Sequence, residues 1–291
     1  MKEQLSKKVK QAIRLLQSYK GEQPLEVAYS GGKDSDVILR LAKMAGVNYR
    51  AIYKCTTIDP PHTIAHCKSK GVEIIHPKEK FFDLVKRKGA PTWRVRYCCD
   101  VLKEYKILDN VVLGIRRAES KKREKLYQEP IQCRNFGNSK KNHINMYLPI
   151  LDWTNEDLSE FIMEEGIKCH PLYYDEQGNF HVERRLGCIG CPMQSDRGKG
   201  DFKQHPKFLR RLIQCEKVFL ADRPESKTVK KFGDAYRLAF NNLFCDSYGE
   251  FIVKTQPNLF GEEFDAKKAA TGIISELVRK SKKSRISMPK M

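Results

Sequence analysis

The stretch that decides the fold is a short apolar run and the polar turn after it, Leu25-Glu26-Val27-Ala28-Tyr29-Ser30-Gly31-Gly32-Lys33-Asp34-Ser35. The apolar run predicts a strand, and the residues from Asp36 to about Ala45 have helical spacing. Small residues in the turn leave backbone N–H groups open at the start of that helix, where the helix dipole favours an anion. This strand-turn-helix unit therefore predicts a phosphate site.

The alternation of strand and helix continues outward from this turn. Strands are expected at 49–53, 72–75, 111–114 and 146–150, and helices at 64–70, 81–88, 98–108 and 157–165. Such an order predicts an α/β fold with a doubly wound parallel sheet and right-handed crossovers. The basic, polar residues 115–141 are expected to form a loop over the site. Thr154 is expected to cap the helix that follows it.

The domain organisation follows from the same pattern. Residues 1–20 are expected to form an N-terminal helix packed on the core, because Leu5, Val9, Ile13 and Leu16 have helical spacing. Residues 21–185 are expected to form the nucleotide-binding α/β domain. We expect residues 186–291 to hold a metal-site segment and a mainly helical region, with a helix at 267–280 and a basic tail after it.

Composition narrows the class of protein. The chain has 291 residues, of which 40% are hydrophobic and 31% charged, which is ordinary for a folded protein. No apolar run approaches the length of a membrane span, and the first residues lack the apolar core of a secretory signal, so we expect a cytoplasmic protein without membrane contact. Nothing in the pattern fixes the oligomeric state.

The net charge of +19 points to anionic partners. A surface this basic attracts polyanions by long-range attraction and counterion release, so DNA or RNA is one expected partner. The alternative is that the basic residues serve small phosphate-bearing substrates and solubility.

The turn at residues 30–35 allows specific roles. Lys33 would neutralise phosphate oxygens, while Ser30 and Ser35 would donate hydrogen bonds to them. Asp34 would hold Mg²⁺ through water if ATP is the substrate, or else cap the helix. A Walker A loop requires Gly-x4-Gly-Lys-Ser/Thr, which this turn lacks, so the ordinary kinase and GTPase classes lose support.

Two further segments are expected at the same edge of the sheet, where the strands end. Arg116 follows the strand at 111–114 and is expected to bind phosphate or sulfate. Asp59 follows the strand at 49–53, where it would contact ribose or base, or else set a turn before two prolines.

Cysteine spacing gives the second sharp signal. The adjacent pair Cys98-Cys99 and the pair Cys188-Ile189-Gly190-Cys191 supply four thiolates, the number that a cubane cluster or a structural zinc requires. Because the chain shows no export signal, a disulfide framework is not expected. The sequence does not distinguish an iron-sulfur cluster from zinc, and buried free thiols are a third interpretation. The other six cysteines are expected to be small core residues.

Together these motifs resemble the phosphoadenosine phosphosulfate (PAPS) reductase-like family of the PP-loop ATP pyrophosphatases, which are adenine nucleotide alpha hydrolase-like proteins. The resemblance runs from about residue 25 to 195 and also rests on Gly-x-Arg-x-x-Glu-Ser at 114–120 and Pro-x-x-Asp-Trp-Thr at 149–154. It implies a PP-loop (HUP-like) domain that binds an adenine nucleotide, ATP or PAPS/APS, with Gly114, Arg116 and Glu119 in the site. It also implies a [4Fe-4S] cluster, with zinc as the alternative, on Cys98, Cys99, Cys188 and Cys191.

The resemblance fails at one important place. Sulfonucleotide reductases finish with a Glu-Cys-Gly-Leu/Ile-His segment whose cysteine attacks the sulfur of the substrate, and this sequence has no such string. Cys245, its last cysteine, stands in Phe244-Cys245-Asp246-Ser247.

The expected function is therefore an ATP pyrophosphatase or adenylylating activity in sulfur transfer. Lys33, Asp34 and Arg116 would be catalytic, Mg²⁺ would accompany ATP, and a sulfur donor protein would be one partner. Two alternatives stay open: a PAPS or APS reductase that releases sulfite, and a non-catalytic subunit that binds nucleotide and nucleic acid.

Overall fold

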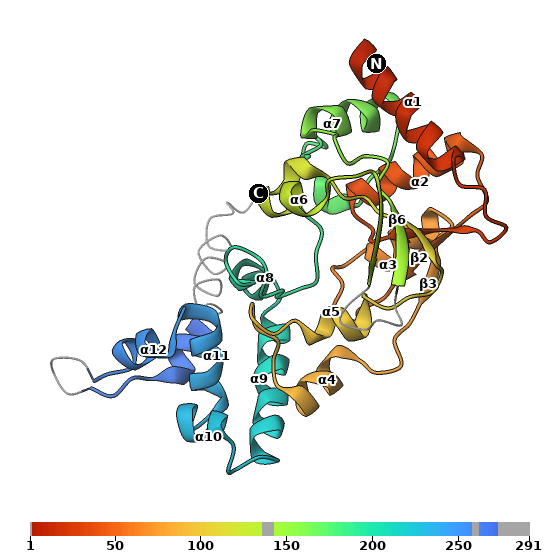
Figure 1. Ribbon diagram of the computed structural model, residues 1–291. Coiled ribbons are helices and arrows are strands. Elements are labelled where there is room, and N and C mark those ends of the chain that lie inside the picture. The colour runs from red at the N-terminus through yellow and green to blue at the C-terminus, as the bar shows by residue number, and fades with distance from the viewer. Residues whose placement is uncertain (1, 136–142, 258–261, 273–291) are drawn as a thin grey trace, which may run out of the picture. The chain divides into compact units, whose positions relative to one another are not determined.

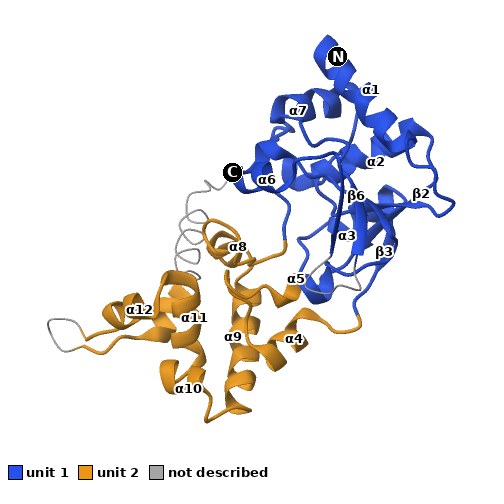
Figure 2. Ribbon diagram, viewed as in Figure 1, with its two compact units in different colours: residues 1–77, 99–187 blue, residues 78–98, 188–291 orange. Residues whose placement is uncertain are grey.

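The computed structural model describes residues 2–135, 143–257 and 262–272. The chain divides into two compact units that are each discontinuous in sequence (Figure 2). The first unit contains residues 1–77 and 99–187, and the second contains residues 78–98 and 188–291. Residues 78–98 therefore belong with the C-terminal part of the chain.

A six-stranded sheet forms the centre of the first unit, with the strand order β3-β2-β1-β4-β6-β5 (Figure 1). Its strands are β1 (Leu25–Tyr29), β2 (Tyr49–Lys54), β3 (Glu73–Ile75), β4 (Asn110–Val112), β5 (Ile131–Asn135) and β6 (His143–Tyr147). Neighbouring strands pair in parallel except β5 and β6, which are antiparallel. The expected α/β fold with a mainly parallel sheet is confirmed. Because β1 pairs with β2 on one side and β4 on the other, strand order reverses at β1, where such sheets bind ligands.

Helices of the first unit bury their apolar faces against this sheet. They are α1 (Glu3–Gln17), α2 (Lys33–Ala45), α3 (Thr63–Ser69) and α7 (Asn155–Glu164), while the short helix α6 (Lys121–Leu126) has no buried residue. The apolar stripe of α1, with Leu5 and Leu16, lies in one core with Val27 of β1 and Ile38 of α2. The hydroxyl of Thr154 accepts a hydrogen bond from the N–H of Asp157 at the start of α7, as its sequence predicted.

Residues 115–141 were expected to form one loop, and that expectation is wrong for their described part. A 3-10 turn at Arg117–Glu119, helix α6 and strand β5 lie within it. The sequence hides β5 because it is a polar edge strand whose Ile131 is 42% exposed, so no apolar run marks it. Its backbone groups on one side pair with β6. Residues 136–142 lie outside the described residues.

The second unit is helical, as expected of the C-terminal region. Its helices are α4 (Phe81–Lys88), α8 (Lys199–Gln204), α9 (Pro206–Ala221), α10 (Lys227–Phe232), α11 (Ala235–Phe244) and α12 (Tyr248–Lys254). The rings of Phe81 and Phe208 stack with their centroids 6.1 Å apart, which joins α4 to α9. Helix α5 (Tyr97–Leu102) is shorter than expected and crosses the boundary between the units.

The remaining sequence predictions fall near the C-terminus. Residues 266–272 are helical, and the rest of the helix expected at 267–280 and the basic tail lie outside the described residues. Within the ranges given above, no helix has both the length and the apolar character needed to cross a membrane.

Candidate functional site

The turn between β1 and α2 has the backbone of an anion site. Gly31 has a φ of 78°, in the left-handed region, and a Cβ there would lie 3.1 Å from the side chain of Thr63. The hydroxyl of Ser35 donates to the carbonyl of Gly32 at 2.6 Å, which closes the first turn of α2. These contacts place the N-terminus of α2 at the carboxyl end of β1, where its dipole favours negative charge.

Arg116 and Asp34 form a largely buried ion pair beside this turn. Arg116 is 2% exposed, and its Nε donates to Asp34 Oδ1 at 2.6 Å. Its other two nitrogens donate to the carbonyl of Trp153 at 3.3 Å and to Asn155 Oδ1 at 3.1 Å. With all three nitrogens bonded to protein, the geometry favours a role for Arg116 in holding Asp34. Its direct contact with phosphate stays a prediction.

Lys33 completes the charge arrangement around Asp34. Its Nζ lies 3.2 Å from Asp34 Oδ2 and 3.4 Å from the carbonyl of Arg184, and it sits 5.3 Å from the ring centroid of Tyr173. Asp34 thus lies between two cations. Phosphate oxygens entering the turn would compete with Asp34 for the ammonium of Lys33 and free the carboxylate for Mg²⁺, so the two expected roles are linked.

A cavity of about 300 Å³ opens beside the turn, at the carboxyl ends of β1, β2 and β4. Ser30, Asp34 and Ser35 line it from the turn. Two cations line it from β2 and α6, and each has a carboxylate partner: Lys54 lies 3.1 Å from Glu26, which also lines the cavity, and Arg123 pairs with Glu119. Its volume lies at the lower end of the range for small-molecule sites, roughly 300 to 1,000 Å³. Strand ends, an open helix N-terminus and cationic side chains therefore meet at one cavity.

Gly114 allows β4 to approach the turn closely. A Cβ at this position would lie 3.1 Å from the backbone oxygen of Asp34 and 3.2 Å from its Cβ. Any side chain here would push the start of α2 away from β4. The structure thus gives a steric reason for the glycine that the motif at 114–120 contains.

Glu119 contacts arginines of its own unit. Its carboxylate forms an ion pair with Arg123 and lies 3.9 Å from Arg185. Burial and the neighbouring Arg185 lower the pKa of Arg123, while Tyr127 and Asp34 act in the opposite direction. Arg123 lines the cavity and was not among the site residues expected from the sequence. The signal that could have found it is its spacing of four from Glu119, which lies in the 3-10 turn just before α6.

Asp59 holds a local turn. Its carboxylate accepts hydrogen bonds from the backbone N–H of Thr56 at 2.9 Å and from the Thr56 hydroxyl at 2.7 Å. Asp59 does not line the cavity, and neither do Lys33, Arg116 and Glu119. The turn-setting alternative is the one that these contacts support, and a contact of Asp59 with ribose or base stays a prediction.

A buried polar network lies behind the turn, and sequence reasoning missed it. The hydroxyl of Tyr29 donates to Asp36, and His66 Nε2 lies 3.1 Å from both carboxylate oxygens of Asp36. Burial and the charge of Asp36 raise the pKa of Tyr29 far above its ordinary value, so the phenol stays a donor. Because the N–H of Asp36 bonds to the carbonyl of Gly32, the network stabilises the turn from inside.

The pair Cys188 and Cys191 lies on a tight turn. The N–H of Cys191 donates to the carbonyl of Cys188 at 3.2 Å, and Gly190 between them has a φ of 68°. A Cβ on Gly190 would meet the ring of Phe202 at 2.3 Å, so only glycine fits. This local geometry suits two neighbouring metal ligands.

The four expected ligands fall on both sides of the unit boundary. Cys98, Cys188 and Cys191 belong to the second unit and Cys99 to the first. In the part of the chain that the structure describes, no group of three or more His, Cys, Asp or Glu is arranged to hold a metal ion. The Cys-x-x-Cys turn fits a ligand pair, while a centre of four thiolates stays a prediction.

Five of the other cysteines are buried, as expected of small core residues: Cys55, Cys67, Cys169, Cys215 and Cys245. Cys133 is an exception, because it is exposed on the edge strand β5 and its thiol contacts Asn145 Oδ1 at 2.9 Å. The expectation for Cys133 was wrong because the edge strand itself was missed.

Comparisons with known proteins agree with this architecture. Residues 24–194 match the phosphoadenosine phosphosulfate reductase domain. The chain is 30% identical over 169 residues to an uncharacterized 37.8 kDa protein of Escherichia phage 186, a match that covers 53% of this chain and 47% of that protein. It is 35% identical over 75 residues to the phosphoadenosine 5'-phosphosulfate reductase of Vibrio campbellii, covering 25% of this chain and 26% of that enzyme.

The chain thus spans about half the length, or less, of these curated relatives. Among solved structures, the PAPS reductase of Candida auris in its phosphate complex is similar with a TM-score of 0.44 and 16% identity, covering 65% of this chain and 96% of that chain. On the match over residues 24–194, this chain belongs to the phosphoadenosine phosphosulfate reductase domain family of the PP-loop superfamily.

Proposed function

We propose that this protein is an ATP pyrophosphatase that adenylylates an acceptor for sulfur transfer. The observation that carries the proposal is the cavity at the carboxyl ends of β1, β2 and β4, which joins the open N-terminus of α2 to Lys54 and Arg123. A pyrophosphate group carries several negative charges. Backbone N–H groups at a helix terminus together with buried cations stabilise such a group better than either alone.

In the proposed reaction, an acceptor oxygen attacks the α-phosphorus of ATP and the bond from that phosphorus to the bridging oxygen breaks. Pyrophosphate leaves with Mg²⁺, and the acceptor becomes an adenylate. Lys33 and Arg123 would stabilise charge on the transferred group, while Arg116 holds Asp34 in position. A sulfur nucleophile from a donor would then displace AMP.

Three buried thiols are poor candidates for the nucleophile that a PAPS or APS reductase requires, which is why reduction is not our first proposal. Burial raises the pKa of Cys245, which is 4% exposed, and burial with the charge of Asp36 raises the pKa of Cys67 to about 12. Burial also raises the pKa of Cys169. Thiols in this state are poor nucleophiles at neutral pH. PAPS reduction is the second candidate, favoured by the match to the Vibrio reductase.

The proposed activity is tested by measuring pyrophosphate release from ATP by the wild-type protein and by two lysine variants. We expect the protein with Mg²⁺-ATP and an acceptor to release pyrophosphate, and Lys33→Met to lower that rate at least about 100-fold because a transition-state cation is removed. Lys43→Met, on the same helix but exposed, is the matched control and should leave the rate unchanged.

Other outcomes would support the alternatives. Sulfite release from PAPS or APS with a thiol reductant would replace the proposal by the reductase. Nucleotide binding that is lost in Lys33→Met, without release of pyrophosphate or sulfite, would indicate a non-catalytic subunit.

The metal content is tested separately, because Cys98, Cys99, Cys188 and Cys191 would hold the [4Fe-4S] cluster or a zinc ion. When bound, a cluster would supply electron-transfer or sulfur-transfer chemistry. We expect protein purified without oxygen to contain iron and sulfide at about four each per chain. Both should be lost in Cys188→Ser and kept in Cys215→Ser, which alters a buried core thiol. Zinc alone would support a structural site.

A further inference from the structure

Positive charge is concentrated in the second unit. Residues 78–98 and 188–291 contain 28 Lys and Arg against 14 Asp and Glu, which gives +14 of the chain's +19. The first unit, which holds the PP-loop turn, has 27 Lys and Arg against 22 acids. The excess positive charge therefore lies mainly outside the unit that would bind the nucleotide. This distribution favours a second anionic ligand, bound by the second unit.

A cavity of about 150 Å³ lies within the second unit. It is bordered by the segment 92–94, the end of α10, the end of α11 and the start of α12. Its walls contain three aromatic rings, two amides and two cations: Trp93, Phe232, Tyr248, Asn241, Asn242, Arg94 and Lys231. A cavity of this size accepts a molecule as large as benzene, but it is too small for a whole nucleotide.

Two rings at this cavity are exposed although they are large and aromatic. Trp93 is 46% exposed and Tyr248 is 36% exposed. Tyr248 is held by an edge-to-face contact with Phe232, at 5.7 Å between centroids, and by stacking with Phe251 at 5.8 Å. Its hydroxyl donates to the carbonyl of Lys231 at 3.2 Å. Such rings offer flat faces on which a base can stack, worth about 1 to 3 kcal/mol per base.

Each exposed ring has a cation over one of its faces. The guanidinium carbon of Arg94 lies 4.5 Å from the ring centroid of Trp93, and Nζ of Lys231 lies 3.9 Å from that of Tyr248. Lys231 forms no ion pair with any residue in the described ranges, so its charge is available. Alternating rings and cations match the alternation of bases and phosphates in a single strand.

The amides complete the chemistry. Asn241 Nδ2 donates to Asn242 Oδ1 at 3.3 Å, which fixes the two side chains relative to each other. Each amide carries two donor hydrogens and an acceptor oxygen, so this one bond leaves others available to a ligand. Side-chain amides can pair with base edges in this way.

We propose that this cavity binds one unstacked base of a single-stranded nucleic acid. The base stacks on Trp93 and Tyr248, the amides contact its edge, and the flanking phosphates lie at Arg94 and Lys231. The proposal rests on the proposed function only in naming the class of acceptor, because the binding itself requires no ATP.

Tryptophan fluorescence provides a direct test, because the chain has only 2 Trp and the other, Trp153, is 2% exposed. We expect oligothymidylate or oligouridylate to quench Trp93, and an abasic oligomer of equal length and charge to quench it much less. The quenching should be absent in Trp93→Phe. Quenching by either polymer supports base binding at the cavity.

Affinity measured by anisotropy of a labelled oligomer gives a second readout. Trp93→Ala should weaken binding about 5- to 100-fold through lost stacking. Lys231→Ala should reduce the slope of log affinity against log salt by about one. Lys217→Ala, which removes a cation 4.6 Å from the Tyr236 ring outside the cavity, is the matched control and should change the affinity less than Trp93→Ala does.

Equal binding of the abasic oligomer, without quenching, would overturn the proposal and leave only general attraction of polyanions. The Lys33→Met variant separates the two proposals, since it should lose pyrophosphate release and keep its affinity for the oligomer. A protein that binds the oligomer but never releases pyrophosphate would overturn the proposed function alone.

Discussion

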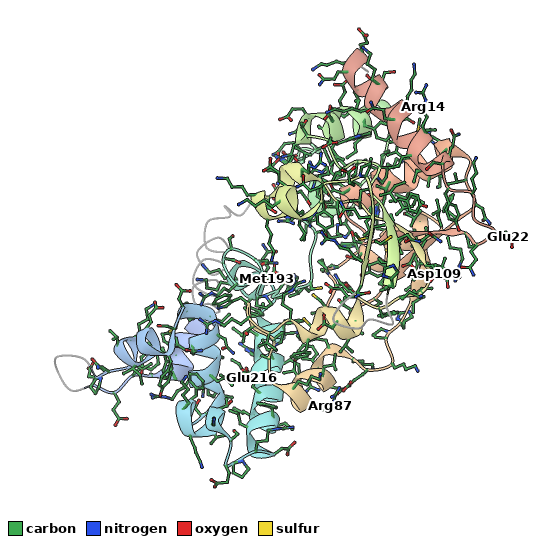
Figure 3. All side chains as sticks on the ribbon, viewed as in Figure 1. Arg14, Glu22, Arg87, Asp109, Met193 and Glu216 are labelled. Carbon is green, nitrogen blue, oxygen red and sulfur yellow. The ribbon has the colours of Figure 1, made fainter. Side chains whose placement is uncertain are left out.

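The two units hold buried acidic side chains in different ways. In the first unit Asp34 lies between Lys33 and Arg116, and Asp36 has His66 and Tyr29 as partners. In the second unit Glu216 of α9, labelled in Figure 3, is 1% exposed and has no side-chain partner within the described residues; the backbone of Ala90 is the one group that lowers its pKa. Burial raises the pKa of Glu216 to about 8, so this carboxyl is mostly neutral at pH 7. A charge is kept inside the molecule only where partners stabilise it.

The largest expected effect comes from breaking a buried pair. Asp34→Ala leaves the buried guanidinium of Arg116 without its carboxylate, and we expect a loss of about 3 to 5 kcal/mol in the free energy of unfolding. Urea denaturation measures it. Asp152→Ala is the control, because Asp152 pairs with Arg117 but its side chain is 66% exposed, so it should cost less than about 1 kcal/mol. Equal losses for the two variants would contradict the importance of burial.

Glu216→Gln tests a buried carboxyl that, unlike Asp34, has no cation beside it among the described residues. Its pKa of about 8 lies above the ordinary 4.5, so between these values the folded state binds more protons than the unfolded state. Stability must then fall as pH rises from 4.5 to 8. The neutral glutamine should remove this contribution and stabilise the protein at pH 7 on the order of 3 kcal/mol, with little gain at pH 4.

Urea denaturation across pH 4 to 8 measures this difference. Glu225→Gln is the control, since the Glu225 side chain is 87% exposed. A wild-type stability that changes with pH in the same way as that of Glu216→Gln would show that Glu216 is ionised in the folded protein.

Gly114→Ala tests the close approach of β4 to the turn in the first unit, and we expect it to have a smaller effect on stability than the two variants above. The added methyl group would lie 3.1 Å from the backbone of Asp34, and we expect a loss of about 1 to 3 kcal/mol through overpacking. Nucleotide affinity should fall with it, because the start of α2 moves. Gly187→Ala meets nothing within 4 Å and is the control for glycine replacement.

The smallest effect concerns the support of Arg116. Its acceptors Trp153 and Asn155 flank Thr154, whose hydroxyl caps α7. Thr154→Ala should cost about 1 kcal/mol in thermal or urea unfolding, and Thr154→Ser should recover most of it. A loss that serine does not recover would assign the effect to packing of the threonine methyl group.

Short-range features of the site were predictable, while its long-range contacts were not. The turn at 30–35 and the cap at Thr154 depend on residues within a few positions of each other, and both lie where the sequence placed them. The Arg116–Asp34 pair joins residues 82 positions apart, and the Asp36–His66 contact joins residues 30 apart. No local pattern reports such pairs.

The sequence by itself determined the α/β order of strands and helices, because apolar periodicity and a glycine-rich turn act locally on the backbone. Its motifs carried the resemblance to a PP-loop family. Tertiary structure alone decided that Arg116 is buried against Asp34, that β5 pairs as an edge strand, and that residues 78–98 join the helical unit. It also placed Trp93 and Tyr248 at one cavity. These outcomes depend on which surfaces meet when the chain folds, and burial changes the energies of the charges and rings that meet there.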